Sequence, residues 1–303
     1  MPEITRRPES AAQQFINAAA IGKNSILKSL SKEDESIIES TDQNNDTAFI
    51  LSCRNGHKKT VNYLAKNLLA NIYHAGDKKR TGFLNAVVEN QETILKYLHE
   101  FDNSLCLAKD EDGNTALILS ILHSKPAITE FLIEKLELDF RGTGFLKRTA
   151  FHSAVISGNE SAMLVFKKLY ARYRESDFRG DTSEGLIAGV KNSDFKTLFN
   201  SRDGNGDSAL FLACEFADVS IFKLLVEEFK FQIDETGTNG RTCFIAATQN
   251  ENLEILQFIN DLDGEMCLQA DDEGKTCKDY AKNVKTAKFV KFFVDAAKVR
   301  WIL

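Results

Sequence analysis

The sequence predicts an all-α fold, built as a solenoid of helix-turn-helix repeats. Three observations predict it: a short block recurs at a constant interval, small and apolar residues stand at fixed places in each block, and turn residues separate the blocks. Each block begins at an anchor residue, and the anchors are Gln13, Thr47, Thr81, Thr115, Thr149, Ser183, Ser208, Thr242 and Thr276. Successive anchors lie 34 residues apart, except that 25 residues separate the sixth anchor from the seventh.

The same predicted parts recur in each unit. A Ser or Thr anchor can cap a short first helix, because its side chain accepts hydrogen bonds from the free amides of the first turn. Small residues follow four or five places later, where helices must approach closely: Ala86, Ala154, Ala188, Ala213 and Ala246. A residue about nine places after the anchor can take the left-handed conformation that ends a helix. These residues are Gly56, Asn90, Gly158, Asn192 and Asn250. A second helix with an apolar stripe, as in residues 94–98 or 253–258, then leads into a Gly-rich turn.

The unit resembles the ankyrin repeat, whose signature is T-P-L-H-x-A. Residues 149–154 read Thr-Ala-Phe-His-Ser-Ala, with Ala150 in place of the proline. Turns of the form D-x-x-G-x-[ST] precede the anchors at residues 110–115, 203–208 and 271–276. Proline is absent from the second place of every unit, and the turns before Thr81 and Ser183 lack the Asp and Gly. The resemblance covers residues 11–303 and implies an ankyrin-type solenoid with short β-turn hairpin tips.

One array therefore accounts for nearly the whole chain. We expect residues 1–10 to form an N-terminal tail and residues 11–303 to form about nine units. Residues 11–41 and 271–303 would be the caps, and residues 42–270 the internal repeats. The sixth unit, at 178–202, is short, so residues 195–199 must supply its second helix and we expect an irregularity there. The lysines of the last unit suit the polar outer face of a cap: Lys278, Lys282, Lys285, Lys288 and Lys291.

Composition and charge exclude several classes of protein. The net charge is −6, whereas a nucleic-acid surface would normally be basic. The first residues contain no apolar run of the kind found in a signal peptide, and no apolar window is long enough to span a membrane. The six cysteines are scattered and form no CxxC pair, which favours reduced thiols in the cytoplasm.

No pattern in the sequence indicates catalysis, a metal site or a cofactor. His57 and His152 stand where the ankyrin pattern itself uses histidine to hold turns and helix ends, so we expect both to be structural. Cys53 and Cys214 take a buried small-residue place, where a thiol acts as a small apolar group. The glycines of residues 204–206 lack the GK[ST] of a phosphate loop, and the acidic turns lack the ligand order of an EF-hand. We expect no enzymatic activity.

The resemblance implies that a protein partner binds to the hairpin tips and first helices, which line a concave groove. The place seven after the anchor is aliphatic in four consecutive units, the third to the sixth. Apolar tip residues and the neighbouring polar ones extend this stripe, because apolar patches rimmed by polar groups mark interaction surfaces. The predicted partner-binding residues are Val88, Leu122, His123, Phe145, Leu146, Arg148, Ile156, Val190 and Phe216. The alternative is that the aliphatic residues pack against neighbouring first helices and are buried.

Basic residues gather near the middle of the chain, in residues 78–80 and 141–179. They would suit an acidic amphipathic helix or an extended acidic peptide, unless they form only a solvated face. We therefore expect a non-enzymatic scaffold or adaptor in the cytoplasm. Two alternatives stay open: a permanent subunit of a cytoskeletal or ciliary assembly, or a bacterial effector that acts in the cytosol of a host cell.

Overall fold

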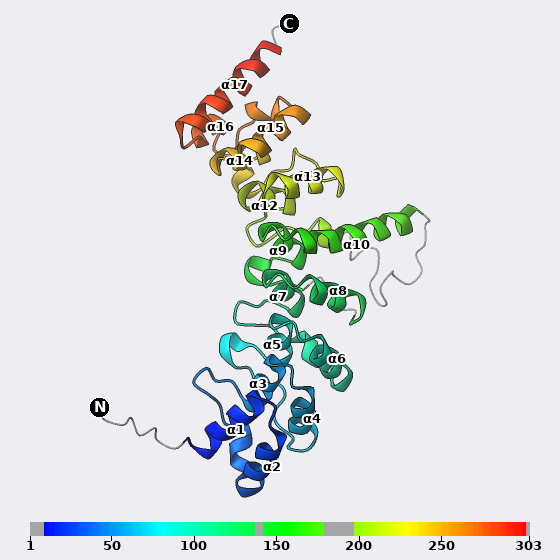
Figure 1. The fold of residues 1–303 in the computed structure, drawn as a ribbon. Helices are drawn as coiled ribbons and strands as arrows, with labels where there is room; N and C mark the ends of the chain where they lie inside the picture. The colour runs from blue at the N-terminus through cyan, green and yellow to red at the C-terminus, as the bar shows by residue number, and fades with distance from the viewer. Residues whose placement is uncertain (1–8, 137–141, 179–196, 301–303) are drawn as a thin grey trace, which may run out of the picture. The chain divides into compact units, whose positions relative to one another are not determined.

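The chain is a series of short helices joined by tight turns. A computed structural model describes residues 9–136, 142–178 and 197–300, which hold helices and isolated antiparallel bridges but no β-strand. The predicted all-α repeat fold is confirmed. These residues fall into two compact units, unit 1 at 1–138 and unit 2 at 139–303, and each unit is described separately (Figure 1).

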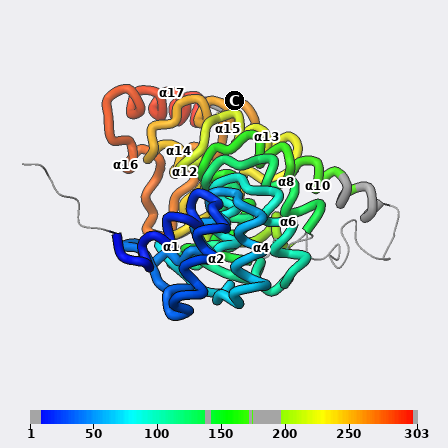
Figure 2. Tube along the Cα trace, turned by 60° about the horizontal axis from the view of Figure 1, so that its bottom comes forward, coloured from blue at the N-terminus to red at the C-terminus, as the bar shows by residue number. Residues whose placement is uncertain are grey.

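Unit 1 contains four helix pairs. Its first helices follow one another through the contacts α1–α3, α3–α5 and α5–α7, while α2, α4 and α6 form a second row beside them (Figure 2). Short 3-10 turns link several of the pairs: η1 (Glu35–Glu39), η2 (Asp77–Lys79) and η3 (Asn103–Leu107). The pairs are α1 (Ala11–Ala20) with α2 (Asn24–Glu33), α3 (Ala48–Arg54) with α4 (Lys58–Lys66), α5 (Gly82–Val88) with α6 (Glu92–Phe101), and α7 (Ala116–Leu122) with α8 (Pro126–Glu134).

Unit 2 has the same construction. Its first helices stack in the order α9, α12, α14 and α16. Its 3-10 turns are η4 (Phe145–Lys147), η5 (Thr238–Gly240) and η6 (Met266–Leu268). The pairs are α9 (Ala150–Ile156) with α10 (Glu160–Phe178), α12 (Ala209–Phe216) with α13 (Val219–Glu227), α14 (Cys243–Gln249) with α15 (Leu253–Leu262), and α16 (Cys277–Tyr280) with α17 (Val284–Arg300).

The predicted anchors begin the first helices. Each of six anchor hydroxyls accepts a hydrogen bond from the amide three residues later, as in Thr242 with Ile245 at 3.3 Å. The other five are Thr47, Thr81, Thr115, Thr149 and Ser208. The first unit differs, since Ser10 caps α1 and Gln13 lies inside the helix. Ser10 offers a side-chain acceptor three residues before Gln13, and this lets the helix begin earlier.

The predicted helix ends are right at three described positions. Gly56, Asn90 and Gly158 have φ values of 75°, 61° and 60°. The prediction for Asn250 is wrong: its φ is −96°, its side-chain amide bonds back to Ala246, and Glu251 takes the left-handed conformation at 60°. Asn192 lies outside the described residues. The predicted small residues Ala86, Ala154, Ala213 and Ala246 are fully buried, and Ala188 is outside the described part of the chain.

Aspartates hold the hairpin tips closed. One carboxylate oxygen of Asp203 accepts the amides of Asn205 at 2.8 Å and Asp207 at 3.1 Å. The same two bonds recur at Asp42, Asp110 and Asp271. Asp207, another tip acid, is buried and accepts the amide and hydroxyl of Thr238 from the next tip. These acids are structural groups in the turns.

The described helices on either side of the predicted sixth unit are in contact: α9 packs against α12, so the unit at Ser208 lies next to the unit at Thr149. The second helix of the fifth unit, α10, has 19 residues, while α4, α8 and α13 have 9 each. Where the described chain resumes, Phe199 is buried and its ring lies 4.9 Å from that of Phe151. The predicted anchor Ser183 and most of the predicted sixth unit lie outside the described residues, so the bounds of that unit stay a prediction.

Candidate partner-binding surface

The predicted surface residues differ widely in exposure. Phe145, Phe216 and Leu122 are 60%, 53% and 47% exposed, and Leu146 is 36% exposed. His123 is exposed, whereas Arg148 and Ile156 are half-buried. The prediction for Val88 needs correction, since this residue is only 9% exposed. Its helix α5 lies between α3 and α7, which cover it from both sides. Val190 lies outside the described residues.

Unit 2 carries an apolar surface that we call the aromatic patch, made of Phe145, Leu146, Arg148 and Phe216. Phe145 and Leu146 form the tip of η4, where Leu146 has a φ of 53°. The Leu146 carbonyl accepts the amide of Gly204 at 2.5 Å, which ties this tip to the next one. Phe216 is the last residue of α12, in the unit that carries Gly204. Two stacked units therefore build the patch.

Arg148 joins the two halves of the aromatic patch. Its Nε donates to the buried carboxylate of Asp203 at 3.1 Å, and its guanidinium carbon lies 5.7 Å from the centre of the Phe216 ring. The other oxygen of that carboxylate holds the hairpin tip. Because Arg148 is fixed in this way, little side-chain entropy remains to be lost when a partner covers the patch.

A polar network that the sequence analysis missed lies on the same first helices of unit 2. Arg241 lies 3.3 Å from the Glu215 carboxylate and donates to the Gln249 side chain at 2.6 Å. Burial raises the pKa of Glu215, and Arg241 opposes this rise only in part. Glu215 and Gln249 both stand seven places after their anchors, so a comparison of that place between units could have found the network.

Unit 1 presents a basic surface around the predicted residues Leu122 and His123. The guanidinium of Arg80 lies 3.3 Å from His123 Nε2. Burial lowers the pKa of His123, and the charges of Arg80 and Lys125 lower it further. Nearby, Arg54 is neutralised by Asp46 at 2.6 Å. The positive charge of this surface thus lies on Arg80, Lys78 and Lys125, which surround the His123 ring.

Comparison with known proteins supports the repeat. A family model described as "Ankyrin repeats (3 copies)" matches residues 15–105 and 185–271. The chain belongs to the ankyrin repeat family. It is also 22% identical, over 227 residues, to a protein named "Transient receptor potential cation channel subfamily A member 1 homolog" from Caenorhabditis elegans. That match covers 75% of this chain but 16% of the relative. Ankyrin repeats generally mediate protein–protein interaction, and the family is typically non-enzymatic.

The histidines of the ankyrin signature have structural hydrogen bonds. His152 Nδ1 accepts the Thr149 amide at 3.2 Å, and its Nε2 faces the Ser201 carbonyl at 3.1 Å. A carbonyl only accepts, so Nε2 carries the proton and the ring is neutral. Burial lowers the pKa of His152, which is consistent with this state. His57 Nε2 faces the Ala20 carbonyl at 2.9 Å, and so links two ankyrin units.

The cysteines of the ankyrin units are mostly buried. All six cysteines are free thiols, and burial raises the pKa of Cys277 to about 12. High thiol pKa values disfavour the reactive thiolate. Within the described ranges, no group of three or more His, Cys, Asp or Glu side chains could hold a metal ion. None of the helices that the structure describes is both long and apolar enough to cross a membrane.

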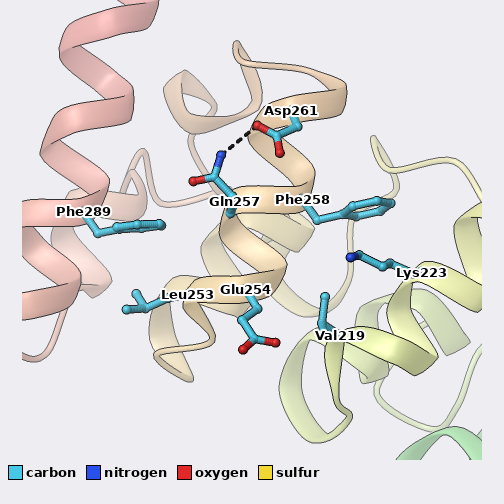
Figure 3. Close-up of a pocket in the computed structure, with 8 residues that line it drawn as sticks. All are labelled: Val219, Lys223, Leu253, Glu254, Gln257, Phe258, Asp261 and Phe289. Carbon is cyan, nitrogen blue, oxygen red and sulfur yellow. Dashed lines mark hydrogen bonds between the residues drawn. The ribbon is translucent and has the colours of Figure 1, made fainter.

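A pocket of about 420 Å³ lies on the second helices α13 and α15 and on α17, away from the hairpin tips. Leu253 and Phe289 line one side, and Phe258 lines the other (Figure 3). The ammonium group of Lys223 lies 5.2 Å from the centre of the Phe258 ring. Gln257 donates to Asp261 at 2.7 Å, so these two polar groups of the pocket already have a partner within the ankyrin units.

Proposed function

We propose that this ankyrin repeat protein is a scaffold or adaptor, and that a protein partner binds its aromatic patch. One observation carries the proposal: Phe145 and Phe216 are more than half exposed around Arg148, which the fold holds in place. Aromatic residues and arginine are the residue types that dominate the binding energy of protein interfaces. The predicted stripe through Leu122 and Ile156 runs over both units and stays a prediction.

The exposed phenylalanines of the patch can contribute strongly to the free energy of binding. Covering a Phe side chain completely stabilises a complex by about 1.5–3 kcal/mol. Phe145 and Phe216 begin more than half exposed, so each has a large part of that free energy to gain. Loss of one such residue is expected to weaken binding by about tenfold or more.

The charge beside the patch supports an acidic partner. Lys147 is exposed in the tip between Leu146 and Arg148. A partner with alternating acidic and apolar residues, either an amphipathic helix or an extended peptide, would bring carboxylates to Lys147 and apolar groups to the patch. We place this interaction in the cytoplasm, which the six free cysteines support.

Affinity capture from an extract of the source cells tests the proposal. The bait would be the wild type, a Phe145→Ser/Phe216→Ser double variant, and a Phe292→Ser control. Phe292 is 68% exposed on α17 and far from the tips in its repeat, so the control removes a similar apolar surface. We expect a partner that wild type and control retain and the double variant loses. Retention by a double variant with an unchanged melting curve would place the partner elsewhere.

A permanent structural subunit is the second candidate. Several apolar residues outside the tips are strongly exposed, among them Leu69 and Leu107 in unit 1 and Leu164 in unit 2. A subunit of a large assembly would bury such residues against its neighbours. Size-exclusion chromatography of native extract distinguishes the two candidates: an adaptor elutes partly as the free chain, whereas a permanent subunit elutes only in a large complex.

A further inference from the structure

Three arginines occupy the same place, directly before an anchor: Arg80, Arg148 and Arg241. In unit 2, Arg148 Nε donates to Asp203 at 3.1 Å, and Arg241 Nε donates to a backbone carbonyl at 3.2 Å. In unit 1, Arg80 Nε is buried and has no hydrogen-bond partner. A buried donor without an acceptor loses its hydration and gains nothing in return. Arg80 is therefore incompletely satisfied within its own chain.

The next hairpin tip explains the difference. Asp110 stands in unit 1 where Asp203 stands in unit 2, five places before the following anchor. Its outer oxygen already accepts the Asn114 side-chain amide at 3.2 Å. The equivalent of Asn114 in the other tip is Asp207, whose side chain has no N–H to donate and accepts the Thr238 hydroxyl instead. Asp203 is thus free to receive Arg148, whereas Asp110 is occupied by Asn114.

Arg80 meets a histidine instead of a carboxylate. Its Nη2 lies 3.3 Å from His123 Nε2. Since a guanidinium can only donate, Nε2 must accept, and the proton of the neutral ring is on Nδ1. The charged groups that face His123 are Arg80 and Lys78 from the tip, Glu89 from the end of α5, and Lys125 from the start of α8. Three cations and one anion therefore surround this ring.

We propose that Arg80 and His123 receive a carboxylate of the protein partner, and that His123 takes up a proton when the carboxylate binds. This inference rests on the proposed function for the nature of the ligand. Because Arg80 Nε is buried, the partner's carboxylate would meet the Nη groups of Arg80, and a guanidinium matches a carboxylate in geometry and charge. Leu122, which is exposed and adjacent in sequence, offers an apolar contact beside the charge. The site therefore fits an acidic residue that lies next to an apolar residue in the partner.

Proton uptake follows from the donor geometry. In the free protein, His123 Nε2 uses its lone pair to accept from Arg80. When a carboxylate arrives, a proton from solution can occupy that lone pair, and then both side chains donate to the carboxylate. An adjacent anion raises the pKa of a histidine by about one unit or more.

The pH dependence of binding has a definite sign. The pKa of free His123 lies below its usual value, so the ring is neutral at pH 7. Carboxylate binding raises that pKa. Affinity therefore increases as pH falls from above the bound pKa towards the free pKa, by about tenfold for each unit between them. It levels off below the free pKa, where both states are protonated.

A titration with glutarate, a small dicarboxylate, tests the site without any partner. The readout is the pKa of His123 from the NMR shift of its Cε1 proton, assigned with a His123→Gln variant. Each titration is repeated in sodium chloride of equal ionic strength. We expect glutarate to raise this pKa by about one unit in the wild type and in Lys79→Gln, an exposed change in the same tip. We expect no rise in Arg80→Gln.

The inference would be overturned by an unchanged pKa of His123 in wild type with glutarate, or by an equal rise in Arg80→Gln. If inorganic phosphate raises the pKa and glutarate does not, the ligand is a phosphate group and the carboxylate assignment is wrong. If Arg80→Gln unfolds, Arg80→Lys replaces it, because Lys keeps the charge but lacks the paired donors of a guanidinium. A rise in the His123 pKa that is smaller than in wild type supports the site, and an equal rise contradicts it. Because no partner is present, failure here is separable from failure of the capture experiment.

Discussion

The backbone amide of Gly204 donates a hydrogen bond to the carbonyl oxygen of Leu146, with 2.5 Å between the two atoms. The same bond joins the tips of neighbouring units elsewhere, as between Glu111 and Lys78 at 2.9 Å. It shows that the unit at Ser208 lies next to the unit at Thr149, although 59 residues separate the two anchors. The aromatic patch exists because these two tips meet.

A side chain at position 204 is expected to break this junction. The Cβ of Gly204→Ala would lie 2.8 Å from the Leu146 carbonyl oxygen, which belongs to the backbone and cannot move freely. We expect the free energy of unfolding to fall by about 1–3 kcal/mol, measured by urea denaturation. Asn205→Ala is the control, because it is an exposed change in the same tip. Equal stability of Gly204→Ala and wild type would show that the tips are not in contact.

The ring of Phe199 is expected to hold the returning chain in the stack. It lies 4.9 Å from Phe151 and 5.4 Å from Phe229, and all three rings are buried. Phe199→Ala should lower the free energy of unfolding by about 3–5 kcal/mol, because it removes these ring contacts and leaves a cavity. Phe216→Ala, an exposed change, should lower it by less than about 1 kcal/mol. Comparable losses in the two variants would contradict the buried position of Phe199.

The buried carboxyl of Glu215 predicts a pH-dependent stability. Burial raises its folded pKa above the unfolded value of 4.5, so the folded state binds the proton more tightly. Its favourable contribution is present below the unfolded pKa and is lost as pH rises through the folded pKa. Compared with Glu215→Gln, the wild type should therefore lose stability between pH 4.5 and the folded pKa, measured by denaturation at a series of pH values. A stability difference that stays constant across this window would rule out the raised pKa.

An acidic partner should respond to charge reversal beside the patch. Lys147→Glu places an anion at the tip and is expected to weaken binding by about fivefold, because a rim charge contributes about 1 kcal/mol. Lys288→Glu, on the exposed face of α17, is expected to change affinity little. The measurement is titration of the captured partner at low ionic strength. Tighter binding by Lys147→Glu would indicate a basic partner instead.

The periodic features of the fold were predictable from the sequence. The anchors recur at a fixed interval, and a Ser or Thr hydroxyl can cap a helix without help from distant residues. Thr242 and Thr149 therefore behave as predicted. For the acids of the tips, only the position was predictable. The sequence places Asp207 in a turn but does not show that the Thr238 hydroxyl donates to its carboxylate.

The burial of a side chain depends on residues that are distant in sequence, so it could not be predicted from the repeat pattern. Val88 and Leu122 stand at the same place in their units, yet one is buried and the other exposed. That place in the repeat does not fix what covers the side chain. The sixth unit stays a prediction for a related reason: a short interval fits either a shortened repeat or an insertion, and residues 179–196 lie outside the described part of the chain.

Site-specific photo-crosslinking tests the central claim most directly. A benzophenone amino acid would replace Phe216 in one protein and Phe292 in another, because both residues are exposed but only the first belongs to the aromatic patch. After irradiation in native extract, we predict a covalent adduct with a protein partner at position 216 and none at position 292. An adduct at position 292 without one at position 216 would contradict the proposal that the partner binds the patch.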